Sequence, residues 1–246
     1  MKQKCAFGTI DWVENVFGSP DARQVWGRSR PTQRYAVAGV DGKPIYAEGG
    51  NESTARGLMI LGVNAGMIKR WKFQWFALTK AEHAVDAVPD LLFETSLGNL
   101  FVTEVRSARF QTAEKLSKAR KIEKAINATG SLNYLYWTDA WPLTPTTTNL
   151  VRELRKCGTS NIPKASFEAL SQILKDGPTT FFELRDQKCF RDVVLAAVWA
   201  GKAHIDLLSP VTDSTLVTLN CTTRRLHELL QLSAGGQTWW TSLEKA

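Results

Sequence analysis

Two short apolar runs separated by a turn sequence constrain the fold of this 246-residue chain more than any other feature. Residues 89–94 (PDLLFE) and residues 100–105 (LFVTEV) each have the length and the composition of a β-strand. The intervening TSLGN is typical of a turn, and strands joined by so short a connection pair antiparallel. The sequence therefore predicts a β-hairpin near the middle of the chain.

A helix and a strand are predicted before this hairpin. Residues 52–68 begin with polar side chains and then place apolar ones near helical spacing, which predicts a helix that ends near residues 64–66. Residues 71–78 (WKFQWFAL) are short and rich in aromatic side chains, as in a strand. The first half of the chain thus supplies a helix and a strand to pack with the hairpin.

A second helix and strand follow the hairpin. Residues 111–129 place apolar side chains on one helical face and lysines around the rest, and residues 133–137 (NYLYW) predict a strand. The apolar face consists of Leu116, Ala119, Ile122 and Ile126. The order helix, strand, hairpin, helix, strand predicts an α/β fold with a mixed sheet flanked by helices.

A second unit is predicted after residues 141–149 (WPLTPTTTN), where proline and threonine mark a domain boundary. Residues 146–246 predict three short helices, then two strands within residues 204–219, which is the outline of a winged helix. A terminal helix over residues 224–232 and a tail complete this domain. Trp239 and Trp240 in the tail either dock into a partner or pack on the domain itself.

Residues 1–50 show no sustained periodicity, and segments such as GRSRPTQR predict an irregular basic arm. Two interpretations of this arm stay open, a disordered leader and an arm that contacts DNA. The formal net charge of +7 is compatible with a polyanion as partner, because clustered lysine and arginine release counterions on meeting phosphates.

The cysteines and the apolar segments indicate where such a chain works. The four cysteines form no CxxC pair and no zinc-site spacing with histidine, so a disulfide framework and a zinc cluster are not indicated. The N-terminus lacks an apolar signal core, and no stretch has the roughly 20 apolar residues of a membrane span. We expect a soluble, cytoplasmic, bacterial protein.

The hairpin carries the residues that point to chemistry. Asp90 opens its first strand and Glu104 lies near the end of its second, so the two carboxylates can project from neighbouring strand ends and share Mg²⁺. A metal so held would polarise a phosphodiester and lower the pKa of a bound water. The alternative interpretation makes Asp90 a strand-end residue and pairs Glu104 with a surface arginine.

This pattern resembles the motif of the PD-(D/E)xK nuclease superfamily. At the position where the superfamily ordinarily has lysine, this chain has Arg106. More closely, most of the chain is similar to TnsA-like heteromeric transposase endonuclease subunits. The C-terminal segments GPTTFFELR and VLAAVWAGKAHIDLLSPVTDSTLV share that resemblance. The N-terminal matches are Glu52-Ser53, Gln74, Val88-Pro89-Asp90 and Glu104-Val105-Arg106.

The resemblance implies a restriction-endonuclease-like nuclease domain over residues 51–145 and a winged-helix-like C-terminal domain. It implies Mg²⁺ or Mn²⁺ as cofactor and cleavage of the DNA 5′ strand at transposon ends during DNA recombination. It also implies two protein partners, a DDE transposase subunit (TnsB-like) that cuts and joins the 3′ ends and an AAA+ regulator (TnsC-like).

The resemblance also implies roles for individual residues. Asp90 and Glu104 would hold the metal, Arg106 would contact the scissile phosphate or its water, and Gln74 would help to orient the site. On the following helix a set of basic side chains would grip the DNA backbone, although a solvated charged face is the alternative. That set is Lys115, Lys118, Arg120 and Lys121.

Two departures from the family pattern favour an alternative function. The pattern ES-x-x-E would place a second acid where this chain has Arg56, which leaves Glu52 as the nearest carboxylate. Arg106 can bind phosphate, but its pKa above about 12 prevents it from acting as a base. The alternative is a catalytically decayed adaptor that binds DNA, transposase and the AAA+ regulator. A winged-helix transcription factor is disfavoured, because the segment FRDVVLAAVWAGK is too apolar for a recognition helix.

Overall fold

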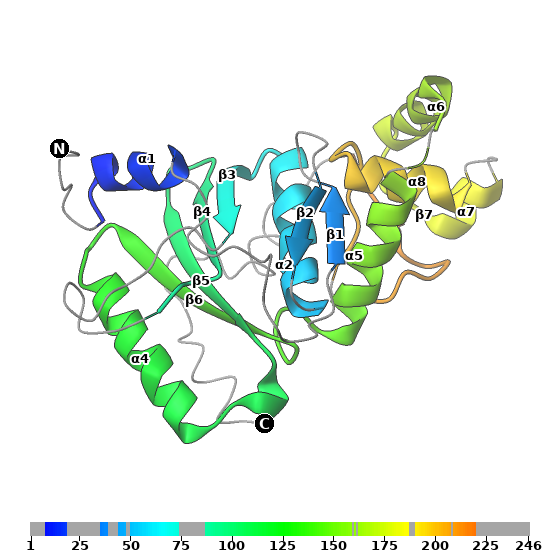
Figure 1. The fold of residues 1–246 in the computed structure, drawn as a ribbon. Coiled ribbons are helices and arrows are strands. Elements are labelled where there is room, and N and C mark those ends of the chain that lie inside the picture. Colours follow the sequence, from blue (N-terminus) through cyan, green and yellow to red (C-terminus); the bar gives the residue numbers. More distant parts are fainter. Residues whose placement is uncertain are drawn as a thin grey trace.

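The computed structural model describes residues 8–18, 50–73, 87–158, 160, 162–186, 190–207 and 209–219, and the backbone of two strands at 35–38 and 44–47. Figure 1 shows a sheet with helices on both of its faces, and a group of short helices beyond one of these layers. The predicted terminal helix, the tail with Trp239 and Trp240, and Gln74 lie outside the described residues.

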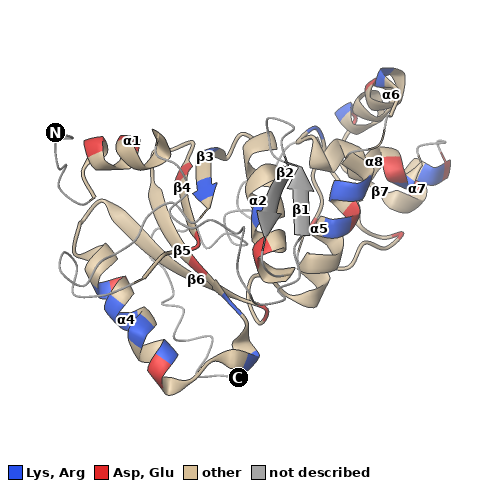
Figure 2. Ribbon diagram, viewed as in Figure 1, with Lys and Arg blue, Asp and Glu red and all other residues tan. Residues whose placement is uncertain are grey.

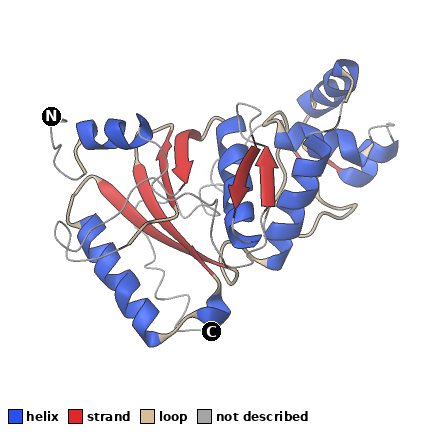
Figure 3. Ribbon diagram, in the orientation of Figure 1, coloured by secondary structure: helices blue, strands red, loops and turns tan. Residues whose placement is uncertain are grey.

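The central sheet has four strands in the order β3-β4-β5-β6. β4 (Leu91–Thr95) pairs antiparallel with both of its neighbours, β3 (Ile68–Phe73) and β5 (Leu100–Arg106), whereas β6 (Leu132–Thr138) pairs parallel with β5. The sheet is therefore mixed, which confirms the predicted α/β class with flanking helices (Figure 3). The restriction-endonuclease-like detail stays a prediction.

The predicted hairpin is confirmed, and its turn explains why it forms. β4 and β5 pair with Leu91 opposite Thr103. The connection closes on itself, since Gly98 N donates to Thr95 O at 3.0 Å and the Asn99 amide donates to the Thr95 hydroxyl at 3.1 Å. Gly98 has a φ of 83°, a left-handed conformation that glycine adopts at little cost.

One face of the sheet packs on α2 (Gly50–Asn64) and α5 (Pro145–Gly158). Side chains alternate along a strand, so every second residue of β4, β5 and β6 enters this layer. The largest core cluster lies here and continues without a break into the C-terminal helices. Its members from the sheet include Leu91, Phe93, Phe101, Val105, Leu135 and Trp137.

The opposite face packs on α4 (Ala113–Asn127) and α1 (Ile10–Gly18). α4 buries Ala119, Ile122 and Ile126, as its predicted apolar face requires, and Thr112 caps its first turn by accepting from the Lys115 amide. The intervening residues of the strands, among them Leu92, Val102, Tyr134 and Tyr136, complete this second core. The site described below lies on this face.

The C-terminal part consists of three helices and a minimal ladder. α6 (Lys164–Lys175), α7 (Phe181–Asp186) and α8 (Arg191–Trp199) occur where three short helices were predicted. β7 (Thr179–Thr180) pairs antiparallel with β8 (Leu216–Val217). α8 is buried between its neighbours, which agrees with its apolar sequence. The winged-helix designation of this part stays a prediction.

The expectation of an irregular arm over residues 1–50 is wrong for part of that segment. Residues 10–18 form α1, and β1 (Tyr35–Ala38) pairs antiparallel with β2 (Pro44–Ala47). α1 buries Val13 and Val16, with Trp12 and Phe17 partly buried beside them, and a helix of nine residues is too short to establish a period from its sequence. Its attachment depends on the sheet, because Arg70 of β3 ion-pairs with Glu14 of α1.

Three further boundaries differ from the predictions. Residues 145–149 lie within the predicted domain boundary at 141–149 and form the start of α5, a helix that was not predicted; proline is compatible with a first helical turn. β3 begins at Ile68 and not at residue 71. The first of the two strands predicted within residues 204–219 is reduced to a single bridge between His204 and Thr218, and the second is the two-residue β8, which pairs with β7.

Candidate functional site

Asp90 and Glu104 lie opposite each other at one end of the hairpin. Asp90 immediately precedes β4, and its amide donates to the Thr103 carbonyl at 3.1 Å, so the ladder that pairs Leu91 with Thr103 continues to this position. The Asp90 carboxylate also accepts the Val105 amide at 2.8 Å. The backbone therefore fixes the Asp90 carboxylate beside Glu104, as the sequence predicts.

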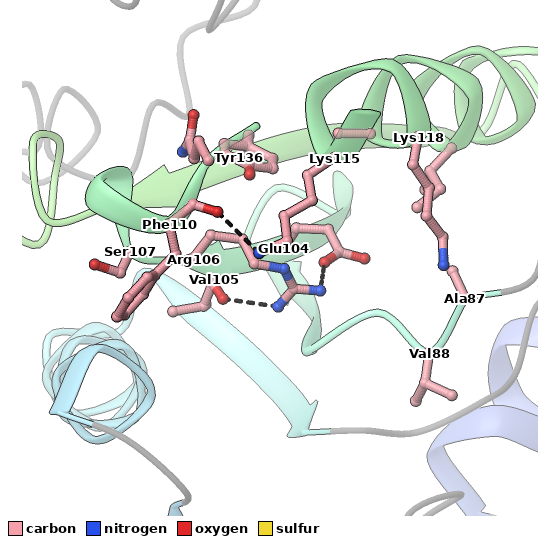
Figure 4. A pocket seen from close by; sticks show the side chains of 13 residues that line it. Ala87, Val88, Glu104, Val105, Arg106, Ser107, Phe110, Lys115, Lys118 and Tyr136 are labelled. Carbon is pink, nitrogen blue, oxygen red and sulfur yellow. Dashed lines mark hydrogen bonds and ion pairs between the residues drawn. The ribbon is translucent and has the colours of Figure 1, made fainter. Parts of the chain in front are cut away.

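Arg106 connects the two carboxylates. Glu104 and Arg106 are two residues apart on β5, so they project from the same face of the strand. The guanidinium Nη1 of Arg106 bonds to Asp90 Oδ2 and its Nη2 bonds to Glu104 Oε2, while Nη1 also donates to the Val105 carbonyl at 2.8 Å. Both acidic side chains thus converge on a single cationic group, which Figure 4 shows beside Glu104.

The electrostatics of this trio follow from its burial. The residues Asp90 and Glu104 are 1% and 3% exposed, whereas the Arg106 side chain is 41% exposed. Burial, followed by the neighbouring Asp90 charge, raises the pKa of Glu104 to about 8, although Arg106 and Lys118 oppose this shift. Two buried carboxylates close enough to repel each other require a positive partner, and the chain supplies Arg106.

A pocket of about 490 Å³ opens above Glu104 and Arg106. Its other wall is α4, from which Lys115 and Lys118 descend toward the cavity (Figure 4). The Lys115 ammonium donates to the Phe110 carbonyl at 2.9 Å. Lys115, Lys118 and Arg106 therefore line a pocket that also contains Glu104, and these positive groups attract an anionic ligand such as a phosphate.

The pocket also carries aromatic and amide side chains. Phe110, Gln111 and Tyr136 line it, and Phe110 is 57% exposed. The Gln111 Nε2 is buried and has no hydrogen-bond partner among the described residues, so it is a donor for a ligand. Burial raises the pKa of Tyr136 to about 12, which keeps its hydroxyl protonated.

Supporting residues hold the end of β5, and sequence reasoning missed them. Asn51 of α2 donates to the Arg106 carbonyl at 3.0 Å. Asp139, just after β6, accepts from the Ala108 amide at 2.7 Å and from the Ser107 hydroxyl at 2.8 Å. Burial opposes ionisation of Asp139, but these hydrogen bonds hold its pKa below the usual value. The sequence did contain a signal for Asp139, namely an acidic residue directly after a strand that pairs parallel with β5. Parallel strands end at the same edge of a sheet, so such a residue lies near the end of β5.

The described structure gives no third acid beside Asp90 and Glu104. Glu52 is half-buried in the first turn of α2, and it forms no metal-type cluster with Asp90 and Glu104. Arg56 is 4% exposed, with its guanidinium carbon 4.1 Å from the centre of the Phe73 ring, so that position supplies no acid. Gln74 falls outside the described residues.

The predicted DNA-binding set divides in two. Lys115 and Lys118 line the pocket, whereas Arg120 and Lys121 are exposed on α4 and do not line it. Lysine and arginine recur along α4 and α5 in Figure 2. Only the first pair is therefore placed to contact a ligand that reaches Glu104.

The donor set at the hairpin fits a divalent cation of the Mg²⁺ type. Such an ion takes one or two carboxylates and completes its shell with water and phosphate oxygens, and Asp90 and Glu104 supply two carboxylates that already meet on one cation. Among the described residues no third histidine, cysteine, aspartate or glutamate joins them. The guanidinium of Arg106 stands where the ion would bind.

Within the described residues no helix is both long enough and apolar enough to cross a membrane. No protein-family model matches this chain, and a search of the curated proteins gave no match either.

Proposed function

We propose that this protein is a metal-dependent DNA endonuclease that serves as the 5′-strand-cleaving subunit of a TnsA-like heteromeric transposase. One observation carries the proposal: Asp90 and Glu104 converge on a single cation at the floor of a pocket whose rim is positively charged. Its partners would be transposon-end DNA, a TnsB-like DDE transposase and a TnsC-like AAA+ regulator.

The residues of the pocket would divide the work of phosphodiester hydrolysis. Asp90 and Glu104 would hold Mg²⁺ or Mn²⁺, which when bound polarises the phosphate and acidifies a water. Lys115 and Lys118 would position the DNA backbone at the rim. Arg106 would bind a non-bridging phosphate oxygen and stabilise charge that develops there, since a guanidinium cannot act as a base.

The test is a strand-specific cleavage assay on transposon-end DNA with the cognate transposase, in Mg²⁺ or Mn²⁺. Asp90→Asn and Glu104→Gln should each reduce 5′-strand cleavage by at least about a hundredfold, the usual cost of removing a charge-stabilising group. The control is Glu94→Gln, because Glu94 is a buried acid of the same sheet that pairs with Lys69 and Arg70. Undiminished cleavage by both site variants would refute the proposal.

A second candidate function is the adaptor, a decayed nuclease fold that joins DNA, transposase and the AAA+ regulator. The observation that favours it is the occupation of the cation position by Arg106, together with Arg56 at the position of the family acid. The same assay separates the two functions. An adaptor would support assembly of the complex and transposase-catalysed 3′-strand cleavage, and its 5′-strand cleavage would be absent in the wild type.

A further inference from the structure

Arg106 makes the contacts that a bound metal ion would make. Its Nη1 bonds to one oxygen of Asp90 and its Nη2 bonds to one oxygen of Glu104. Asp90 cannot turn away, because its Oδ2 also accepts the Val105 amide at 2.8 Å. The cation position between the acids is therefore fixed by the hairpin and filled by the chain itself.

Charge makes the guanidinium and a divalent ion alternatives. The two buried carboxylates carry at most two negative charges, which one divalent ion neutralises completely. A guanidinium added to that ion would leave a net positive charge in a buried site, and the two cations would repel each other at close range. Arg106 must therefore leave the carboxylates when a metal ion enters.

The Arg106 side chain can move away from the carboxylates into the adjoining pocket. Its side chain is 41% exposed and lines the pocket, whereas the two acids are almost fully buried. Lys115 and Lys118 stand at the same pocket, so a backbone phosphate attracted there would bring a negative charge within reach of the guanidinium. Arginine binds phosphate with a geometry as favourable as that for carboxylate.

We infer that Arg106 acts as a latch on the metal site. In the DNA-free protein its guanidinium occupies the position between the two carboxylates and excludes a metal ion. A DNA phosphate draws the guanidinium away, so that the metal ion binds together with DNA. This inference rests on the proposed function, since it assumes that the site accepts DNA and a metal. The metal ion is then bound at this site only in the DNA complex. DNA and metal should therefore each raise the affinity of the protein for the other by the same factor.

The experiment measures Mn²⁺ binding to the DNA-free protein by titration calorimetry. Arg106→Gln removes the latch and should bind Mn²⁺ at least about tenfold more tightly than the wild type. Arg109→Gln is the matched control, because Arg109 loses the same charge nearby but stacks on Phe110 at 4.3 Å. Adding Asp90→Asn to Arg106→Gln should abolish the gain. Equal Mn²⁺ affinities of wild type and Arg106→Gln would overturn the latch.

A second measurement uses the wild type and a variant that keeps the positive charge of residue 106. The Mn²⁺ affinity of the wild type should rise at least about fivefold in the presence of a DNA duplex, the lower end of typical coupling between sites. The duplex should gain affinity from Mn²⁺ by the same factor. Arg106→Lys retains the charge but offers one ammonium in place of the two guanidinium nitrogens that each bind one acid, so its DNA-free Mn²⁺ affinity should lie between those of wild type and Arg106→Gln. Independence of the two ligands in the wild type would contradict the inference.

The outcomes separate this inference from the proposed function. Tight Asp90-dependent Mn²⁺ binding by Arg106→Gln, without DNA cleavage by any variant, would support the latch and refute the endonuclease. Cleavage that depends on Asp90, with Mn²⁺ affinities that Arg106→Gln leaves unchanged, would support the endonuclease and refute the latch.

Discussion

The Asp90 side chain both holds the backbone of the neighbouring strand and forms part of the candidate site. Its carboxylate accepts the Val105 amide, which extends the β4–β5 ladder beyond its last backbone pair, and it also bonds to Arg106. The sequence interpretations of Asp90 as a strand-end residue and as a site residue are therefore compatible. Both contacts are buried on the Asp90 side, where an unsatisfied donor is costly.

We expect Asp90→Ala to lower the free energy of unfolding by about 2–3 kcal/mol, because it leaves the buried Val105 amide without its acceptor and removes a buried anionic partner of Arg106. Asp90→Asn retains an oxygen acceptor and should cost less. Urea denaturation measures both. The control is Asp213→Ala, which breaks an exposed ion pair with Arg185 and should change stability by less than about 0.5 kcal/mol. Equal losses for Asp90→Ala and Asp213→Ala would contradict this account.

His204 gives the C-terminal part a pH-dependent contribution to stability. It is half-buried and its backbone bridges Thr218, and burial holds its pKa below 6.5. Because the unfolded chain binds this proton at a higher pH than the folded protein, stability is retained above pH 6.5 and is lost as the pH falls toward the folded pKa.

The test of this pH dependence is His204→Gln, which removes the titrating group and keeps a polar side chain. The wild type should lose more stability than the variant when the pH is lowered from well above to well below 6.5. Urea midpoints at the two pH values measure the difference. Parallel losses in the two proteins would show that His204 is not the group responsible.

At the scale of elements, the crossing of α2 and α5 connects the sheet layer to the C-terminal helices. Gly57 lies at the crossing, and a Cβ added there would stand 2.3 Å from Val151 Cγ1. Val151 is β-branched and 3% exposed, so it cannot move aside freely. The sequence predicted α2 but not α5, and the need for glycine at this position arises only from the contact between them.

We expect Gly57→Ala to destabilise the protein by about 1–3 kcal/mol, because overpacking outweighs the better helix propensity of alanine. In a Val151→Ala background the clash disappears, and the same substitution should be neutral or stabilising. Thermal unfolding of the four proteins of this double-mutant cycle measures the coupling. Additive effects would mean that the two helices do not meet as described.

At the scale of the whole molecule, the excess of lysine and arginine over acidic residues is distributed over several elements. The position of each basic side chain determines whether it can contact a ligand in the pocket. Figure 2 shows lysine and arginine on α4 and α5 as well as on the C-terminal helices. Only Lys115 and Lys118 of the predicted DNA-binding set reach the pocket that contains Glu104. Net charge alone cannot make this distinction.

The double variant Lys115→Gln/Lys118→Gln should weaken DNA binding and reduce the slope of log affinity against log salt by about 2, since each phosphate contact contributes about 0.9 to that slope. Lys164→Gln/Lys175→Gln on α6 removes the same charge far along the chain and is the control. Fluorescence anisotropy over a salt series measures both slopes. A control variant with an equal reduction would show that DNA binds without preference for the pocket.

The sequence by itself determined the elements whose signals are local. The hairpin, α2, α4, β6 and the three short C-terminal helices all follow from apolar periodicity and turn residues within one segment. It also indicated the pairing of Asp90 with Glu104, because hairpin register depends on a short connection. α1 and α5 escaped prediction: α1 is short, and α5 begins inside the proline- and threonine-rich segment that was interpreted as a domain boundary.

Only the tertiary structure decided the state of the site. The bridge from Arg106 to both acids, the separation of Arg56 from them and the support from Asn51 and Asp139 depend on how strand ends and helix starts meet in space. A motif specifies which side chains share a strand face. Whether their charges are buried, and which neighbouring group balances them, depends on packing between distant segments.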